Sequence, residues 1–147
     1  MRRFVVASAA IVLSVGAVVA QGAGEQGRLQ MKATGEAMSI LSAMSKGERP
    51  YDQALVNSAL ARFDETYRKL PTLYPESLRG VLSDARFSPS DKVWDDKVGF
   101  AAHISSFGGV VTDAKAKTIN LDTLKASVEA IGKQCSNCHE IFRLRNS

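Results

Sequence analysis

Cysteine and histidine are both scarce in this sequence, with two of each among 147 residues. The cysteines, Cys135 and Cys138, lie close together near the C-terminus, and the histidines are His103 and His139. A structural zinc site needs four ligands, usually cysteine and histidine side chains. After Cys135, Cys138 and His139 only His103 remains to complete such a set, so the composition argues against structural zinc.

Repeats, strand patterns and nucleic-acid-binding patterns are also missing. The sequence has no internal repeat, no low-complexity tract and no run of alternating β-branched residues framed by hairpin turns. No block of basic residues has aromatic residues interleaved with it. The formal charge of +4 therefore gives no reason to expect a nucleic acid partner.

The N-terminus has the marks of a secretory signal peptide. Two arginines precede an uncharged apolar stretch over residues 4–19, which is short for a membrane span, and Ala20 offers a small residue for cleavage. We expect residues 1–20 to be removed on export to the periplasm and residues 21–147 to form one domain with a formal charge of +2. An uncleaved N-terminal anchor is the alternative. No other segment is expected to cross a membrane.

Apolar residues recur at spacings of three and four along the expected domain, which predicts helices. The four expected helices cover residues 25–45, 51–70, 91–115 and a last segment from Asn120 through Phe142. Their boundary signals are Gly47 after the first helix and Pro71 and Pro75 after the second. Residues 88–91, a Ser-Pro-Ser-Asp run, offer a cap for the third helix, and Asn120 offers one for the fourth. Gly108 and Gly109 weaken the third helix. The pattern predicts an all-α fold, an antiparallel four-helix bundle.

The fourth helix has the most regular apolar stripe, and both cysteines continue it. The stripe consists of Leu121, Leu124, Val128, Ile131, Cys135, Cys138 and Phe142. On a helix that turns about 100° per residue, Cys135, Cys138 and His139 project within one sector. Two thiols can add to the vinyl groups of a haem, and the adjacent imidazole can bind its iron. The run from Cys135 to His139 therefore predicts one covalently attached haem c, which export supports because bacteria attach this haem outside the cytoplasm.

Two other uses of the cysteine pair fit the sequence less well. A disulfide between Cys135 and Cys138 would close a very small loop on one helix and would stabilise the fold little. A thioredoxin-like redox pair is expected beside a βαβ unit, which the helical pattern does not provide.

Several residues outside the motif agree with one known family. They are Arg143 one turn after His139, Trp94 followed by Phe100, and Met31 with Lys32 in the first expected helix. Together with the C-terminal haem motif they resemble the class II c-type cytochromes, the cytochrome c′ and cytochrome c-556 family, over the whole expected domain. The resemblance implies a four-helix bundle with haem c on its C-terminal helix.

The resemblance also implies that a first-helix residue faces the open side of the iron. In the family this residue is bulky and apolar in cytochrome c′ and a methionine in the low-spin c-556 type, and residues 27–33 are similar to the second pattern. Met31 is therefore the expected sixth ligand and Met38 the alternative, although either could be an ordinary core residue. Relatives commonly carry an arginine at the position of Gly27. Here the adjacent Arg28 is the candidate for a haem propionate.

Further residues are expected near the haem by the same resemblance. The candidates for the buried haem face are Phe63, Tyr67, Trp94 and Phe100, each of which could equally be core. Arg143 would shield the imidazole of His139, or would be a solvated arginine at the helix end. His103 is expected on the surface or in the core of the third helix, with no role at iron.

These features predict a periplasmic mono-haem electron carrier, low-spin with His/Met ligation, that docks transiently with redox partner proteins. Nothing in the chain supplies a general base, nucleophile or oxyanion site near the iron, so an enzyme is not expected. If Met31 does not bind iron, the alternative is a five-coordinate cytochrome c′ that binds nitric oxide or carbon monoxide. A weak peroxidase is the least favoured hypothesis. Family members often dimerise through the first two helices, and the sequence leaves a homodimer open.

Overall fold

The computed structural model describes residues 15–81 and 86–146 of the chain. Its long helices are α1 (Val15–Ser45), α2 (Gln53–Leu73), α4 (Lys97–Lys117) and α5 (Leu121–Phe142). Its short elements are the 3₁₀ turn η1 (Glu76–Leu78), strand β1 (Phe87–Pro89), the one-turn helix α3 (Lys92–Asp95) and strand β2 (Arg143–Arg145). The predicted all-α class is confirmed.

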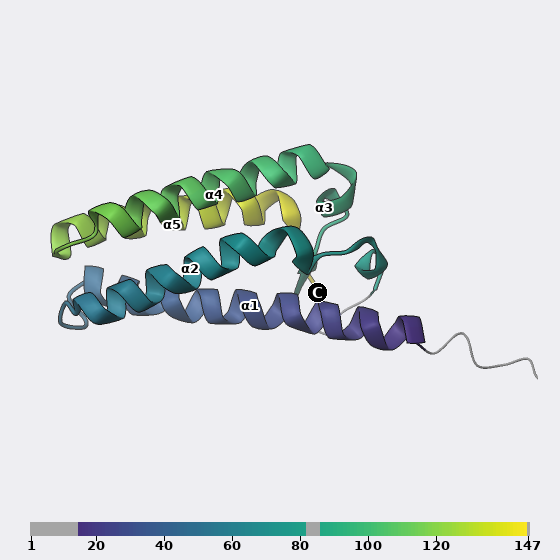
Figure 1. The fold of residues 1–147 in the computed structure, drawn as a ribbon, viewed down its shortest axis with the longest axis horizontal. Helices are drawn as coiled ribbons and strands as arrows, with labels where there is room; N and C mark the ends of the chain where they lie inside the picture. The colour runs from purple at the N-terminus through teal and green to yellow at the C-terminus, as the bar shows by residue number, and fades with distance from the viewer. Residues whose placement is uncertain (1–14, 82–85, 147) are drawn as a thin grey trace, which may run out of the picture.

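The long helices form an antiparallel four-helix bundle, as predicted (Figure 1). α1 packs against α2 and α5, and α4 packs against α2 and α5, so each long helix has two neighbours. Successive long helices run in opposite directions. The end of α2, the start of α4 and the end of α5 therefore meet at one end of the bundle, where η1, α3 and the two strands also lie.

Apolar side chains from all four long helices fill the bundle interior. The largest fully buried ones are Leu41, Met44, Val56, Leu60, Phe63, Val111, Leu124 and Ile131. Phe63 and Phe107 meet edge to face with ring centroids 6.3 Å apart, which joins α2 to α4. Phe63 is therefore part of the general core of the bundle.

The first helix ends where the sequence predicts but begins earlier. α1 finishes at Ser45, yet it starts at Val15 rather than at residue 25, since residues 15–24 contain no proline to stop it. It runs across the expected cleavage point after Ala20, while residues 1–14 of the expected signal peptide lie outside the described part. Among the residues that the structure describes, no helix is long and apolar enough to cross a membrane.

The second helix continues through a proline that was expected to end it. α2 follows Asp52, whose carboxylate accepts hydrogen bonds from two backbone N–H groups of the first turn. It then passes Pro71 and reaches Leu73, so the prediction of an end before Pro71 is wrong. A proline two residues before the helix end removes one backbone donor, and the buried side chain of Leu73 packs against the core.

The third expected helix, residues 91–115, is two helices instead of one. The backbone breaks at Asp96, with φ −120° and ψ 63°, between α3 and α4. Asp91 makes no side-chain cap hydrogen bond, whereas the carboxylate of Asp96 accepts from the Gly99 N–H at 2.8 Å. Residues 88–91 therefore precede only the one-turn helix α3, and the expectation that they cap the long helix is wrong, because Asp96 provides its N-cap.

The start of α5 is as predicted, but its end is followed by a strand. Asn120 Oδ1 accepts from the Thr123 N–H at 3.0 Å, and Thr123 Oγ1 accepts from the Asn120 N–H at 3.1 Å, which is a capping box. After Phe142 the chain enters β2, which pairs antiparallel with β1. Strands of three residues are too short to show an alternating pattern, so the sequence did not indicate this pair.

Candidate haem site

The predicted haem motif lies near the end of α5, at the end of the bundle that also carries α3 and the strands. A small group of buried apolar side chains, called the end cluster here, consists of Leu78, Val93, Trp94 and Phe142. Cys138 packs against the end cluster, and Cys135 packs against the main bundle core. Both thiols are free and half-buried, and so is the imidazole of His139.

Burial keeps the motif side chains uncharged at neutral pH. It raises the pKa of the Cys135 thiol, and burial together with the neighbouring Cys135 raises the pKa of Cys138 to about 11. Burial also lowers the pKa of His139, with a smaller contribution from the positive charge of Arg143. The neutral imidazole is the form that binds a metal. Among the described residues, no group of three or more His, Cys, Asp or Glu could hold a metal ion.

Aromatic rings surround the end cluster and tie it to α2 and α4. Trp94 Nε1 donates to the backbone carbonyls of Tyr74 and Pro75, at 3.1 and 3.2 Å. The Phe100 ring lies between two others, with centroid distances of 6.1 Å to Tyr74 and 5.1 Å to Phe142. The structure thus brings Trp94 and Phe100 to the region of Cys138.

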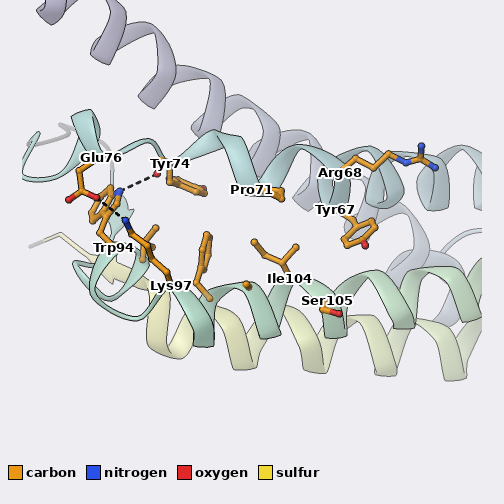
Figure 2. A pocket seen from close by; sticks show the side chains of 12 residues that line it. Tyr67, Arg68, Pro71, Tyr74, Glu76, Trp94, Lys97, Ile104 and Ser105 are labelled. Carbon is orange, nitrogen blue, oxygen red and sulfur yellow. Dashed lines mark hydrogen bonds and ion pairs between the residues drawn. The ribbon is translucent and has the colours of Figure 1, made fainter.

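A groove of about 670 Å³ opens between α2 and α4 beside these rings (Figure 2). Its apolar lining includes Tyr67, Pro71, Tyr74, Val93, Trp94, Phe100 and Ile104. At one end Lys97 Nζ lies 3.5 Å from a carboxylate oxygen of Glu76. Three of the four residues expected to face a haem line this groove, whereas Phe63 does not. Its aromatic walls suit a large, mostly apolar ligand such as haem. Its lining does not include Cys135, Cys138, His139 or Met31, which lie on α5 and α1.

The two candidate methionines of α1 lie at different heights along α5. Met38 Cε is 3.2 Å from the position that a Cβ on Gly132 would occupy, so Met38 is opposite Gly132. α1 and α5 run antiparallel (Figure 1), and both rise about 1.5 Å per residue. Seven residues back along α1 and seven onward along α5 therefore bring Met31 level with His139. Met38 lies about 10 Å away along the bundle.

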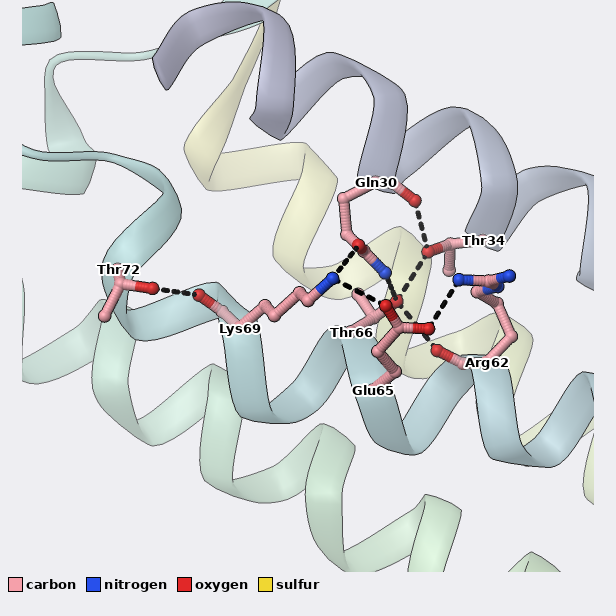
Figure 3. A network of polar contacts seen from close by, with 7 residues as sticks. All are labelled: Gln30, Thr34, Arg62, Glu65, Thr66, Lys69 and Thr72. Atoms are coloured by element: carbon pink, nitrogen blue, oxygen red, sulfur yellow. Dashed lines mark hydrogen bonds and ion pairs between the residues drawn. The ribbon is translucent and has the colours of Figure 1, made fainter. Parts of the chain in front are cut away.

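A buried polar network fixes the rotation of α1 against α2 (Figure 3). Gln30 Nε2 donates to Thr66 Oγ1 at 2.7 Å, and the hydroxyls of Thr34 and Thr66 are 2.8 Å apart. Thr66 Oγ1 also donates to the backbone carbonyl of Arg62 at 2.9 Å. Because Gln30 faces α2, Met31 points about 100° away from α2 around the axis of α1. Met38 points away from α2 by a similar angle, on the same side. Met31 is half-buried and packs against the bundle core.

Arg28 lies on the surface, and the neighbouring Gly27 is covered by a ring. The guanidinium of Arg28 donates to the carboxylate of Glu25, with Nε 2.7 Å from Oε2, and both side chains are exposed. A Cβ on Gly27 would lie only 3.3 Å from Cε1 of Tyr74. The Tyr74 ring therefore packs against the position where the family resemblance implies an arginine. Sequence reasoning missed Tyr74, whose only local signal is an aromatic residue before Pro75.

Arg143 and His103 both contact aromatic rings at this end of the bundle. Arg143 is exposed at the start of β2, and its guanidinium carbon lies 4.3 Å from the ring centroid of Phe87. It is also near enough to lower the pKa of His139. His103 is half-buried on α4, with its ring 5.4 Å from that of Phe142.

Comparison with known proteins finds relatives over most of the chain. The family model of cytochrome C′ matches residues 25–143. A cytochrome c-556 from Rhodopseudomonas palustris is 44% identical over 145 residues, which is 97% of each chain. A cytochrome c′ from the same organism is 33% identical over 93% of this chain and 92% of its own.

A solved structure gives the same answer for the fold. The structural model of oxidised cytochrome c556 from R. palustris aligns with a TM-score of 0.77 and 43% identity, over 86% of this chain and 99% of that one. The chain therefore belongs to the cytochrome c′ family of haem proteins, the family that its sequence resembles.

Proposed function

We propose that this protein is a periplasmic electron carrier with one haem c, attached through thioethers to Cys135 and Cys138, and with His139 and Met31 as axial ligands. The observation that carries the proposal is the equal height of Met31 and His139 on the facing helices α1 and α5. The haem, when bound, supplies a one-electron iron(III)/iron(II) couple, and a thioether ligand favours iron(II).

The motif side chains support this role in their described state. The lowered pKa of His139 leaves its imidazole neutral, so no proton has to be removed before it binds iron. The two thiols are unpaired. Both project from one helix, and reaction with vinyl groups needs them free.

The α1 side chains support Met31 over Met38 as the sixth ligand. The network of Gln30, Thr34 and Thr66 holds the rotation of α1 and so fixes the face that Met31 and Met38 share, which leaves height along α5 to decide between them. Met38 already fills the space beside Gly132. The greater identity to the cytochrome c-556 relative, 44%, than to the cytochrome c′ relative, 33%, agrees with methionine ligation.

Visible spectroscopy of the periplasmic holoprotein tests the proposal. We expect low-spin spectra in both oxidation states and no change when carbon monoxide is added to the reduced protein. Met31→Ala should give a high-spin haem that binds carbon monoxide, because the sixth position is then open.

Met38→Ala is the matched control, since it removes the same side chain from the same helix and should leave the spectra low-spin. A low-spin Met31→Ala protein together with a high-spin Met38→Ala protein would assign the ligand to Met38. A wild-type protein that is high-spin and shifts with carbon monoxide would contradict the electron-carrier proposal and favour gas binding.

A further inference from the structure

A compact group of arginines and one aromatic ring lies just beyond the haem motif. It consists of Arg86, Phe87, Arg143 and Arg145, and we call it the C-terminal patch. Across β1 and β2, Phe87 pairs directly with Arg145, and Pro89 pairs with Arg143. Directly paired residues project from the same face of an antiparallel ladder, as do residues two apart on one strand. Phe87, Arg143 and Arg145 therefore share one face.

Contacts within the C-terminal patch confirm this arrangement. The guanidinium carbons of Arg143 and Arg86 lie 4.3 and 5.4 Å from the Phe87 ring centroid. Cation–π contacts of this kind hold guanidinium groups over a ring while their outer N–H donors still face solvent. Phe87 is 39% exposed, so the two guanidinium groups leave part of it open to solvent.

The positive charge of the C-terminal patch is not neutralised within the described chain. Arg86, Arg143 and Arg145 are all exposed, and no ion pair joins any of them to a described carboxylate. Glu140, the nearest acidic residue along α5, is exposed and pairs with none of them. By contrast, Arg79 at the same end is paired with Asp95 at 2.6 Å.

The C-terminal patch is held rigidly to the helix that carries His139. Ser90 Oγ donates to the carbonyl of Ile141 at 2.8 Å, and the Ser90 N–H donates to the carbonyl of Phe142 at 3.0 Å. The buried Phe142 side chain anchors the junction in the end cluster. The arginines of β2, Arg143 and Arg145, are thus held four and six residues after His139 in the chain.

We propose that the C-terminal patch is the docking surface for an acidic face of the redox partner protein, an inference that rests on the proposed electron-carrier function. Carboxylates on the partner would pair with Arg86, Arg143 and Arg145, and its apolar atoms would cover Phe87. Exposed ion pairs are weak individually, but they steer association and are screened by salt. Such a surface suits a complex that forms quickly, exchanges an electron beside the haem motif and separates.

The first test compares small redox reagents of opposite charge. The anion hexacyanoferrate(III) should oxidise the reduced holoprotein faster at low salt than at high salt. The rate should fall as the ionic strength rises from about 10 to about 200 mM. The double variant R86E/R145E should lower this rate by roughly tenfold at low salt. Oxidation by the cation tris(phenanthroline)cobalt(III) should become faster in the same variant. Arg143 is left unchanged because it lies close to His139.

The matched control is K46E/R49E, which makes the same charge change with two exposed cations that follow the end of α1, at the opposite end of the bundle, and that no described carboxylate pairs with. Compared at about 100 mM ionic strength, where the Debye length is about 10 Å, this control should change the rate with hexacyanoferrate(III) by less than about twofold, because it lies about 20 Å along the bundle from His139. At the same ionic strength R86E/R145E should change the rate more. Equal effects of the two double variants would overturn the proposal, because only net charge would then matter.

The second test does not depend on redox activity. Poly-L-glutamate added to ¹⁵N-labelled holoprotein should shift the amide signals of residues 86–88 and 143–146, and R86E/R145E should abolish the shifts. Absence of these shifts in a redox-active protein would reject the C-terminal patch alone, whereas a high-spin wild-type spectrum would reject the proposed function. Shifts at the patch with phosphatidylglycerol vesicles and none with poly-L-glutamate would overturn the acidic-protein partner in favour of a membrane.

Discussion

Tyr74 shows how one side chain closes the haem end of the bundle. Its ring packs on Gly27 of α1, lies edge-on to Phe100 of α4, and is near Cys138 of α5. Its backbone carbonyl accepts from Trp94 Nε1. Three long helices and α3 therefore meet at this residue, and the absence of a side chain on Gly27 is what gives the ring its place.

Burial of Tyr74 leads to a prediction for alkaline pH. Desolvation, with a smaller contribution from Cys138, raises the pKa of its phenol to about 12 from an ordinary value of 10. The unfolded chain therefore loses this proton first, and the free energy of unfolding should fall by roughly 2 kcal/mol as pH rises from 10 to 12. Tyr74→Phe should remove this fall. Urea unfolding of the holoprotein, where Cys138 is a thioether and cannot ionise, measures it.

A control at another tyrosine makes this result specific. Tyr51→Phe should retain the alkaline loss, and ¹³C NMR of labelled tyrosine should still show a ring that titrates near pH 12, which Tyr74→Phe lacks. If Tyr74→Phe loses stability between pH 10 and 12 as steeply as the wild type, the phenol is not buried in the holoprotein.

The contrast between the motif and Tyr74 explains how much of the site the sequence could predict. Cys135, Cys138 and His139 were recognisable because their chemistry depends on spacing within one helix. Tyr74 depends on a contact with Gly27, far away in the sequence, and no local pattern encodes that contact. The surface pairing of Arg28 with Glu25 was likewise hidden, since either residue alone is unremarkable on an exposed helix.

At the level of single elements, two adjacent glycines of α4 have opposite environments. A Cβ on Gly108 would lie 2.4 Å from Cε2 of Tyr67, so the Tyr67 ring requires a glycine there. A Cβ on Gly109 would meet nothing within 4 Å. The helix runs through both residues although glycine has a low helix propensity. At position 108, packing of the Tyr67 ring outweighs that low propensity.

The two glycines therefore predict opposite effects of the same substitution. Gly109→Ala should stabilise the protein by about 0.5–1 kcal/mol, since alanine loses less backbone entropy in a helix. Gly108→Ala should destabilise it by about 1–3 kcal/mol, because the methyl group overlaps the Tyr67 ring. Urea unfolding of both variants measures the difference, and similar stabilities for the two would show that Tyr67 does not pack on Gly108 in solution.

Helix positions were predictable from the sequence, but several helix ends were not. The cap Asn120 and the end at Ser45 follow from local chemistry and were found as expected. The break at Asp96 was missed because two aspartates offer competing caps, and only tertiary packing of α3 decides between them. Pro71 was misjudged because a proline close to a helix end removes little, while burial of Leu73 rewards one more turn.

At the scale of the whole molecule, the bundle leaves a groove between α2 and α4 at the end that carries the haem motif, although no motif residue lines it. The groove of about 670 Å³ has mostly aromatic and aliphatic walls. Such a space adds little to stability unless an apolar group occupies it, since apolar surface gains free energy when water leaves it. A haem that extends from the motif into this groove would therefore stabilise the fold.

This coupling can be measured by preventing attachment without changing the bundle. C135A/C138A, exported in the same way as the wild type, should retain helical circular dichroism but melt roughly 10 °C lower. We expect a loss of about 2–3 kcal/mol of apolar burial, and about 1 kcal/mol shifts the Tm of a domain this size by about 4 °C. Ser136→Ala, which changes an exposed residue inside the motif and keeps both thiols, should melt with the wild type. Equal melting temperatures for the wild type and C135A/C138A would mean that the bundle is complete without covalent haem, and the groove would then need another explanation.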